Sequence, residues 1–185
     1  MAKTSNLREF QEAILNKLKD VTSQVGAVSG SRLGVVVGDK KLLVRLEQVK
    51  EALPMPYVQS VPLTAPWFSG VANIRGNLYN ITDLAQFLGM KPTSKSPMVR
   101  ILLLSSEVTT QVALTVGALI GLRNIDVMQL LPKDKAKIKA KENDAASEAL
   151  FFAEKSYQDA DGEVWLEVDF DVLVKDSVFI QPTLS

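Results

Sequence analysis

The spacing of apolar positions near the start of the chain is helical. Between residues 6 and 25, apolar side chains recur every three or four positions, at Leu7, Phe10, Ile14, Leu18, Val21 and Val25. This period predicts an amphipathic helix, and Asn6 with Glu9 fits a capping box at its start. We expect the apolar stripe either to pack on the rest of the protein or to dock on a partner.

The pattern changes to a period of two after a joint rich in glycine and serine at residues 26–31. The alternating apolar positions are Leu33, Val35, Val37, Leu42, Val44 and Leu46. Alternation predicts strands, and Gly38-Asp39-Lys40 suits the turn between them, so a β-hairpin is expected. Pro54 and Pro56 then interrupt the pattern, and residues 57–61 are expected to form a short strand at a sheet edge, where proline is tolerated.

A second hairpin is predicted around Gly76-Asn77, a pair that suits the positive φ angles of a tight turn. Arg75 then lies opposite Leu78, Ile74 opposite Tyr79, Asn73 opposite Asn80, Ala72 opposite Ile81 and Val71 opposite Thr82. In this register one face is apolar, and the other carries Arg75, Asn73, Asn80 and Thr82. We expect a polar surface led by a guanidinium, with an apolar back packed on a core.

Residues on either side of this hairpin have predicted structural roles. Asp83 reads as a helix N-cap with Gln86 as its capping-box partner. A carboxylate that binds free N–H groups at a helix start is held ionised, so this role is favoured over catalysis. Trp67 and Trp165 are expected to fill the core, with interface anchoring as the alternative.

The second half of the chain repeats the strand-rich pattern. An apolar run at residues 98–104 is followed by a turn region, and alternation then continues from Val112 to Leu122. Asp161-Gly162 predicts another hairpin turn. Residues 124–131 are expected to be extended, and the lysine-rich stretch 133–148 is expected to be a loop. Two such β-units in succession favour two compact barrels over one large sandwich.

Composition excludes several classes of function. Lys plus Arg and Asp plus Glu number 21 each, so no global field attracts nucleic acid or an anionic membrane. The lysines of residues 133–141 are interrupted by Asp134 and have no aromatic residues between them, so nucleic-acid binding is not expected. The N-terminal segment carries charges and has no unbroken apolar stretch, so we expect no signal peptide and no membrane insertion. The default location is the cytoplasm.

The chain has no cysteine and no histidine. This absence removes disulfides, thiolate catalysis, Ser-His-Asp arrangements, imidazole metal ligands and a histidine phosphoacceptor. No glycine-rich phosphate loop or EF-hand spacing is present, and no cofactor or metal is expected.

Acidic residues are frequent near the C-terminal end, at Glu154, Asp159, Asp161, Glu163, Glu167, Asp169 and Asp171. Glycosidase-type acid–base work needs two carboxylates fixed ~5 to 9.5 Å apart in a cleft. Here the carboxylates are scattered around a turn and along alternating strand positions. We therefore expect them to lie on solvated faces.

One ordered run of motifs resembles a known family. The run has a Pro-x-x-x-Pro entry at Pro62 to Pro66, then Trp67-Phe68-x-Gly70, Asn73-Ile74-Arg75-Gly76 and a strand that ends in Asp83-Leu84. It is similar to the signature of the CheW-like adaptors of bacterial chemosensory arrays. Tyr157, Gly162, Trp165 and Leu173 are similar to the late pattern of that family, so the resemblance covers about residues 30 to 180. Leu78-Tyr79-Asn80 replaces the frequent Leu-Pro, and this resembles the pilus-associated, PilI-like branch.

The resemblance implies a mainly β fold of two small, SH3-like, five-stranded β-barrels with an N-terminal helix and short helices. It divides the chain into an N-terminal helix and joint at 1–29 and a CheW-like domain of two interleaved barrels at 30–182. It also implies a non-catalytic cytoplasmic adaptor that joins a CheA-like chemosensory kinase, through the kinase's regulatory domain, to the cytoplasmic tip of a methyl-accepting chemoreceptor. Recruitment to membrane-associated arrays follows, plausibly in type IV pilus twitching motility.

The residues expected to bind a partner are Arg75, Asn73, Asn77 and Asn80. A guanidinium at a hairpin tip offers a planar fork of donors to a carboxylate or to backbone carbonyls. The alternative for Arg75 is a solvated turn residue or an internal ion pair. The alternatives for the whole chain are an SH3-like interaction domain with an unrelated client, or a hydrolase that uses carboxylates alone.

Overall fold

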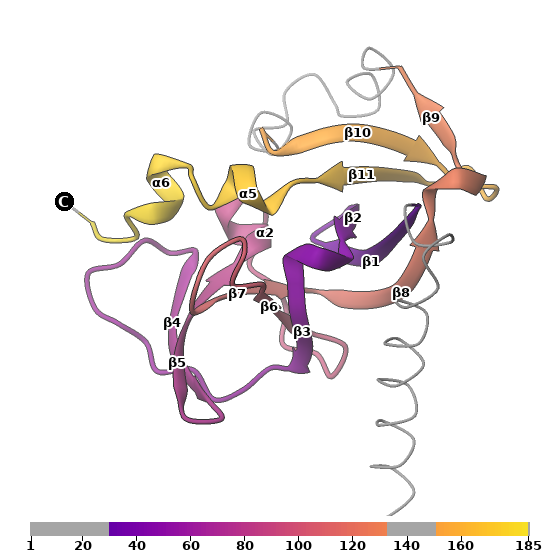
Figure 1. Cartoon of the computed structure of the whole chain (residues 1–185). Helices are drawn as coiled ribbons and strands as arrows, with labels where there is room; N and C mark the ends of the chain where they lie inside the picture. The colour runs from indigo at the N-terminus through magenta and orange to yellow at the C-terminus, as the bar shows by residue number, and fades with distance from the viewer. Residues whose placement is uncertain (1–29, 133–150, 185) are drawn as a thin grey trace, which may run out of the picture. The chain divides into compact units, whose positions relative to one another are not determined.

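The computed structural model describes residues 30–132 and 151–184, which form two β-sheets (Figure 1). The first sheet has six strands in the order β8 (Ala118–Asn124), β1 (Ser31–Val37), β2 (Lys40–Arg45), β11 (Val164–Val168), β10 (Ala153–Gln158) and β9 (Gln129–Leu131). The second sheet has five strands in the order β3 (Val49–Pro54), β6 (Arg100–Leu104), β7 (Val112–Val116), β5 (Asn77–Asp83) and β4 (Phe68–Ile74).

Five short helical segments interrupt the strands of the described chain. They are η1 (Leu46–Gln48), α2 (Leu84–Phe87), η2 (Ile125–Val127), α5 (Phe170–Leu173) and α6 (Ser177–Ile180). The helix predicted for residues 6–25 and the loop predicted for 133–148 lie outside the described residues. The division of the chain at residues 29 and 30 stays a prediction.

The prediction of a mainly β fold is confirmed, but the prediction of two closed five-stranded barrels is wrong. The strand order ends at β8 and β9 in one sheet and at β3 and β4 in the other. A pairing that local pattern does not reveal decides which strands share the six-stranded sheet. β2, from the start of the described chain, pairs in parallel with β11, from its end, with Lys41 opposite Trp165. Early and late strands therefore share the six-stranded sheet.

The two hairpins predicted for the strands of this sheet are confirmed. β1 pairs with β2 antiparallel, with Val37 opposite Lys40, so Gly38-Asp39 makes the turn. β10 pairs with β11 antiparallel around Asp161-Gly162, and Gly162 has a φ of 81°. Local turn chemistry was enough to place both.

The alternating run from Val112 to Leu122 does not form one strand. It divides at Gly117, whose N–H donates to the carbonyl of Val36 (2.8 Å). β7 belongs to the five-stranded sheet and β8 to the six-stranded sheet, and Figure 1 shows β8 running from one to the other. Alternation identified Leu114 and Val116 of β7 as core residues, but in β8 Ile120 and Leu122 are exposed and Leu119 packs on the core, so the pattern showed neither this reversal nor the change of sheet.

The edge strand predicted for residues 57–61 is reduced to a single bridge, between Gln59 and Val71. Gly70 makes this approach possible, since a Cβ there would lie 2.1 Å from the carbonyl oxygen of Gln59. Its φ of 129° also disfavours any other residue. The chain after β3 therefore passes closely along β4 without forming a regular strand.

The main core lies between the two sheets. Buried side chains from both of them meet there with residues from the short helices: Val35, Leu42, Val44, Leu84, Leu88, Leu102, Leu114, Val116, Phe152, Val168, Phe170 and Leu173. A smaller core fills the concave side of the five-stranded sheet, with Ile74, Tyr79 and Ile81 among its members. Trp165 (1% exposed) and Trp67 (9% exposed) are buried, as predicted.

Candidate functional site

The hairpin of β4 and β5 has a different turn from the one predicted. Ile74 pairs with Asn77, so the two turn residues are Arg75 and Gly76, with φ angles of 52° and 84°. Both angles are positive, as a type I′ turn requires. The prediction placed glycine first in the turn, whereas the structure places Arg75 in the left-handed region that most residues avoid.

This correction leaves most of the predicted faces intact. Each β4 residue pairs two positions earlier in β5 than expected, and a shift of two residues preserves alternation. Ala72, Ile74, Tyr79 and Ile81 are buried in the small core, as predicted. On the opposite face Asn73 and Asn80 are exposed, as expected, whereas Asn77 pairs with Ile74 beside the turn and is exposed at the tip.

Thr82 was expected on the exposed polar face, and this is wrong. Its side chain is buried, with 2% exposure. Thr82 pairs with Leu114 of β7, and Leu114 belongs to the main core. Paired residues share a face of a sheet, so Thr82 faces that core. The parallel pairing of β5 with β7 was not visible in the sequence.

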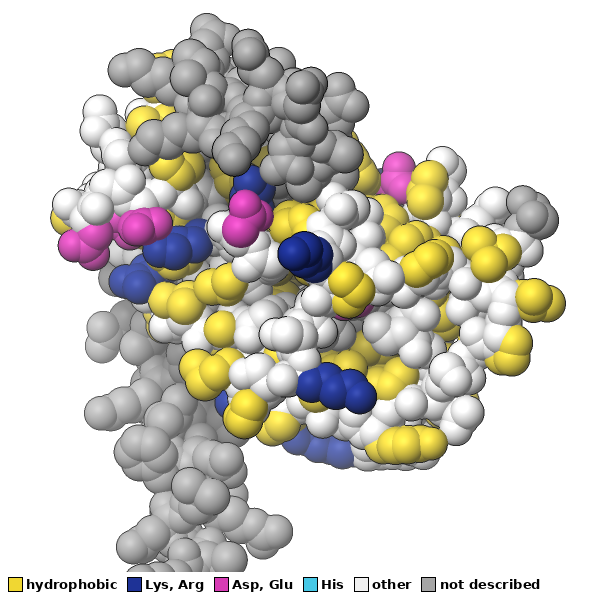
Figure 2. Space-filling view, turned by 180° about the vertical axis from the view of Figure 1, so that it is seen from behind, with side chains coloured by type: hydrophobic (Ala, Val, Ile, Leu, Met, Phe, Trp, Pro, Cys, Tyr) yellow, Lys and Arg dark blue, Asp and Glu magenta, His cyan; other side chains and the backbone are white. Residues whose placement is uncertain are grey.

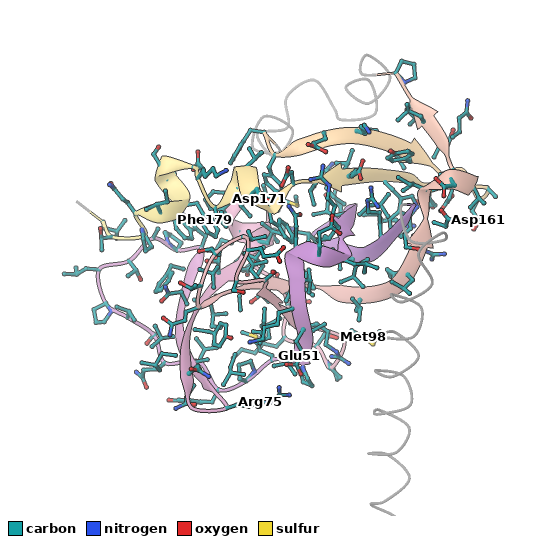
Figure 3. The ribbon with its side chains drawn as sticks, viewed as in Figure 1. Glu51, Arg75, Met98, Asp161, Asp171 and Phe179 are labelled. Atoms are coloured by element: carbon teal, nitrogen blue, oxygen red, sulfur yellow. The ribbon has the colours of Figure 1, made fainter. Side chains whose placement is uncertain are left out.

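Arg75 forms a bidentate ion pair with Glu51 of β3. Nη1 donates to Oε2 (2.9 Å) and Nη2 donates to Oε1 (2.7 Å), and Figure 3 shows the two residues facing each other. The hydrogen bonds and the charge of Glu51 raise the pKa of the Arg75 guanidinium. The Arg75 side chain is nevertheless 71% exposed, against 24% for Glu51. The alternative of an internal ion pair is therefore what the structure shows.

This ion pair connects the two edges of the five-stranded sheet. Glu51 lies on the edge strand β3, and Arg75 caps the hairpin that forms the other edge. Asn73 adds a second constraint, because its Oδ1 accepts a hydrogen bond from the N–H of Gly76 (2.9 Å). The Glu51 ion pair and the Asn73 hydrogen bond thus hold the turn in place, while the Arg75 side chain remains exposed to solvent.

Sequence reasoning missed two residues at this site. Glu51 stands 24 residues before Arg75, and no local pattern links them. Leu78 is 59% exposed and lies opposite Asn73, so it adds an apolar side chain to the polar face. The predicted register already placed Leu78 opposite Arg75, which was the available signal for its exposure.

Asp83 is the N-cap of α2, as predicted. Its Oδ1 accepts from the N–H of Gln86 (3.3 Å), and Thr93 donates to both carboxylate oxygens, each at 2.7 Å. The predicted capping box also requires the Asp83 N–H to donate to the Gln86 side chain. That bond is not what the structure shows, because the Asp83 N–H donates to the carbonyl of Trp67 (2.8 Å). The carboxylate is fully engaged in local structure.

The prediction that the C-terminal acidic residues lie on solvated faces is wrong for Glu167 and Asp169. Glu167 is 1% exposed and accepts from Arg32 (2.7 Å) and from the hydroxyl of Tyr157 (3.3 Å). Burial and the charge of Glu167 raise the pKa of Tyr157. These contacts satisfy Glu167 within the six-stranded sheet.

Asp169 belongs to a polar cluster, the junction network, with Arg45, Gln48, Glu154 and Asp171. Gln48 donates through Nε2 to Asp169 (2.6 Å) and to Asp171 (3.0 Å), and Arg45 donates to Asp169 (3.2 Å) and to Glu154. Burial alone would raise the pKa of Asp169, but the Gln48 hydrogen bond, the Asp171 N–H and Arg45 hold it below the ordinary value. Such an ionised, engaged carboxylate cannot serve as a general acid.

Two searches of the described residues bear on other kinds of site. Within residues 30–132 and 151–184, no group of three or more metal-ligating side chains is placed to hold a metal ion. In the same part of the chain, no helix has both the length and the apolar character needed to cross a membrane.

Comparisons with known proteins agree with this geometry. A family model described as the CheW-like domain matches residues 32–178, which is most of the chain. The chain belongs to the CheW-like family. The crystal structure of the scaffolding protein TtCheW from Thermoanaerobacter tengcongensis is similar in fold, with a TM-score of 0.61 at 16% identity over 80% of this chain and 94% of that one.

A curated relative is Protein PilI from Pseudomonas aeruginosa strain PAO1. This CheW-like chain is 36% identical to it over 75 residues. The matched stretch covers 40% of this chain and 40% of PilI.

Proposed function

We propose that this CheW-like protein is a non-catalytic adaptor that couples chemoreceptors to a chemosensory histidine kinase. The observation that carries the proposal is the family match across residues 32–178. The likeness to a protein described as a scaffold supports it. The proposed partners are the regulatory domain of a CheA-like kinase and the cytoplasmic tip of a methyl-accepting receptor, and the proposed place of action is the cytoplasmic side of receptor arrays.

The proposed contact surface is the β4–β5 hairpin, with Arg75, Asn73, Asn77 and Asn80 as partner-binding residues. All four lie at or beside a tip that two independent constraints hold in place, the Glu51 ion pair and the Asn73–Gly76 hydrogen bond. A surface that is already ordered loses little conformational entropy when it binds. The exposed Leu78 gives this polar face an apolar centre.

The pilus-linked branch is a narrower proposal. The 36% identity to PilI over 75 residues supports it, together with Leu78-Tyr79-Asn80 after the turn. We propose that the protein acts in control of type IV pilus twitching motility. Pull-down from the native bacterium followed by mass spectrometry tests the adaptor assignment, with a chemoreceptor-type kinase and its receptor as the expected prey. Recovery of an unrelated client without either protein would reject the adaptor assignment.

Charge reversal at the hairpin tip tests the contact surface. Arg75→Glu is expected to leave the protein folded and to weaken binding of the kinase regulatory domain or receptor tip by about tenfold or more. Calorimetry or biolayer interferometry with purified partners measures the loss. Lys155→Glu is the matched control, since Lys155 is an exposed cation in β10 of the six-stranded sheet, whereas the hairpin belongs to the five-stranded sheet.

The double variant Arg75→Glu with Glu51→Arg separates two roles for Arg75. Recovered binding means that Arg75 acts by positioning the turn through its ion pair with Glu51. Binding that stays weak means that the guanidinium itself contacts the partner. If Arg75→Glu binds both partners as well as the parent does, the hairpin is not the contact surface.

A further inference from the structure

Residues 55–66, the strap, join β3 to β4 without forming a regular strand. The strap lies against β4 at Gln59, whose N–H donates to the carbonyl of Val71 (2.8 Å) and whose carbonyl accepts from the Val71 N–H (2.9 Å). Gly70 leaves room for this approach, since it has no Cβ to meet the Gln59 carbonyl. The two hydrogen bonds therefore fix the backbone of the strap beside the β4–β5 hairpin.

Side chains next to this bridge point to alternate faces of the sheet. Val58 packs on the small core that holds Tyr79 and Ile81. Neighbouring side chains of an extended chain point in opposite directions, so Tyr57 and Gln59 point away from that core. The Tyr57 hydroxyl donates to Oε1 of Gln59 (3.4 Å), which agrees with both side chains lying on one side.

Tyr57 lies on the same face as the proposed contact residues. Gln59 pairs with Val71, and paired residues share a face of a sheet. Asn73 lies two residues further along β4, so it occupies this face together with its partner Leu78. The antiparallel register of the bridge places Tyr57 beside Asn73, on the side away from Leu78. The hairpin face therefore extends onto the strap.

This extended face combines exposed apolar groups with one cation. Tyr57 is 83% exposed, the highest value among the large apolar side chains of the described residues, and Leu78 is 59% exposed. Arg75 is the only charged residue between positions 52 and 82. Figure 2 shows hydrophobic and basic side chains over the five-stranded sheet, while the acidic side chains in view gather mainly elsewhere. The face thus suits a partner that is apolar and negatively charged.

We propose that Tyr57 is a further partner-binding residue, and that this face binds a partner segment presenting an apolar side chain next to a carboxylate. The inference rests on the adaptor function proposed above. The Tyr57 ring and Leu78 would cover the apolar side chain from both sides of Asn73. The Arg75 guanidinium has five N–H donors, of which the Glu51 pair uses two, so it can also bind the carboxylate.

The physical case for Tyr57 is its rigidity as well as its exposure. Tyrosine and arginine are the side chains that most often dominate the binding energy of an interface. A tyrosine has only two side-chain torsions to fix, and here the Gln59–Val71 hydrogen bonds and the packing of Val58 already hold its backbone. Binding therefore orders little that the free protein leaves mobile.

Binding of the full chain to the purified kinase regulatory domain and to a receptor-tip fragment tests the role of the ring. Tyr57→Ala is expected to weaken binding of the partner that Arg75→Glu also affects, by about tenfold. Tyr57→Phe is expected to stay close to the parent, because it keeps the ring. Val127→Ala is the control, since Val127 is 80% exposed but lies in η2, between two strands of the six-stranded sheet.

A matched pair of charged variants tests the chemistry of the partner. Tyr57→Glu and Tyr57→Lys both remove the ring, and they also serve if Tyr57→Ala fails to fold by circular dichroism. A carboxylate on the partner repels the first and attracts the second. Tyr57→Glu is therefore expected to bind more weakly than Tyr57→Lys, with a difference that shrinks as salt is added. Equal or reversed affinities reject an acidic partner segment.

The outcomes separate this inference from the function on which it rests. If Arg75→Glu weakens binding and Tyr57→Ala does not, Tyr57 is not a contact residue and the adaptor function stands. Equal losses for Tyr57→Ala and Val127→Ala also overturn the inference. A parent that binds neither purified partner rejects the adaptor function, and the inference with it.

Discussion

Arg75 and Arg45 both pair with carboxylates, but in different surroundings. The Arg75–Glu51 pair lies at the hairpin tip, where the guanidinium side chain is 71% exposed. In the junction network, the Arg45 side chain is 27% exposed and its partner Asp169 only 12%. An arginine–carboxylate pair therefore orders an exposed turn at the hairpin tip, whereas in the junction network it links residues that are largely buried.

The location of the junction network explains its role. Gln48 lies where the chain leaves the six-stranded sheet after β2, and Asp169 lies where it leaves the same sheet again after β11. The Gln48 side chain also accepts from the N–H of Phe170 (3.1 Å) and is 2% exposed. The network thus cross-links the two points at which the chain leaves the six-stranded sheet, whereas the Arg75–Glu51 pair positions a single turn.

The largest effect is expected from Asp169→Ala, which removes one hydrogen-bond partner from each of Arg45 and Gln48 and removes the α5 N-cap. Loss of one member of a buried charged pair costs about 3 kcal/mol or more of unfolding free energy. Urea denaturation measures it. The exposed Asp161→Ala is the control, expected within about 0.5 kcal/mol of the parent. Equal effects of the two variants on the unfolding free energy would show that the junction network does not stabilise the fold.

Acid unfolding is expected to depend on the same network. The pKa of Asp169 is lower in the folded protein than in the unfolded chain, so the unfolded chain binds the proton more tightly. The contribution of Asp169 to stability is therefore complete above the ordinary aspartate pKa of about 4 and disappears as the pH falls through the folded value. Urea midpoints measured from neutral to acid pH are expected to fall more steeply for the parent than for Asp169→Asn. Parallel curves would show that Asp169 does not contribute.

The smallest effect on stability is expected at the hairpin tip. Arg75→Gln is expected to change the urea midpoint only slightly, because an exposed ion pair contributes little to stability. Sodium chloride at about 1 M shortens the Debye length to about 3 Å. It should therefore reduce the small shift in urea midpoint caused by Arg75→Gln, and leave the larger shift caused by Asp169→Ala unchanged. A large, salt-independent loss for Arg75→Gln would show that the tip is structural rather than a contact surface.

Local pattern predicted most strands and turns correctly. The hairpins at Gly38-Asp39 and Asp161-Gly162 and the inward faces of β4 and β5 follow from alternation and turn chemistry. The site was predicted less well. Arg75, Asn73, Asn77 and Asn80 are exposed or at the tip as expected, but Glu51, Leu78 and the position of the turn were missed. Thr82 was assigned to the wrong environment.

The sequence by itself determined most of the strands, the turns at Gly38-Asp39 and Asp161-Gly162 and most inward-facing side chains of β4 and β5, because these depend on neighbours within a few residues. Tertiary structure alone decided the parallel pairing of β2 with β11, the burial of Glu167 and Asp169, and the partner of Arg75. Each of these joins segments far apart in the chain, and their energies depend on burial that only the assembled sheets provide.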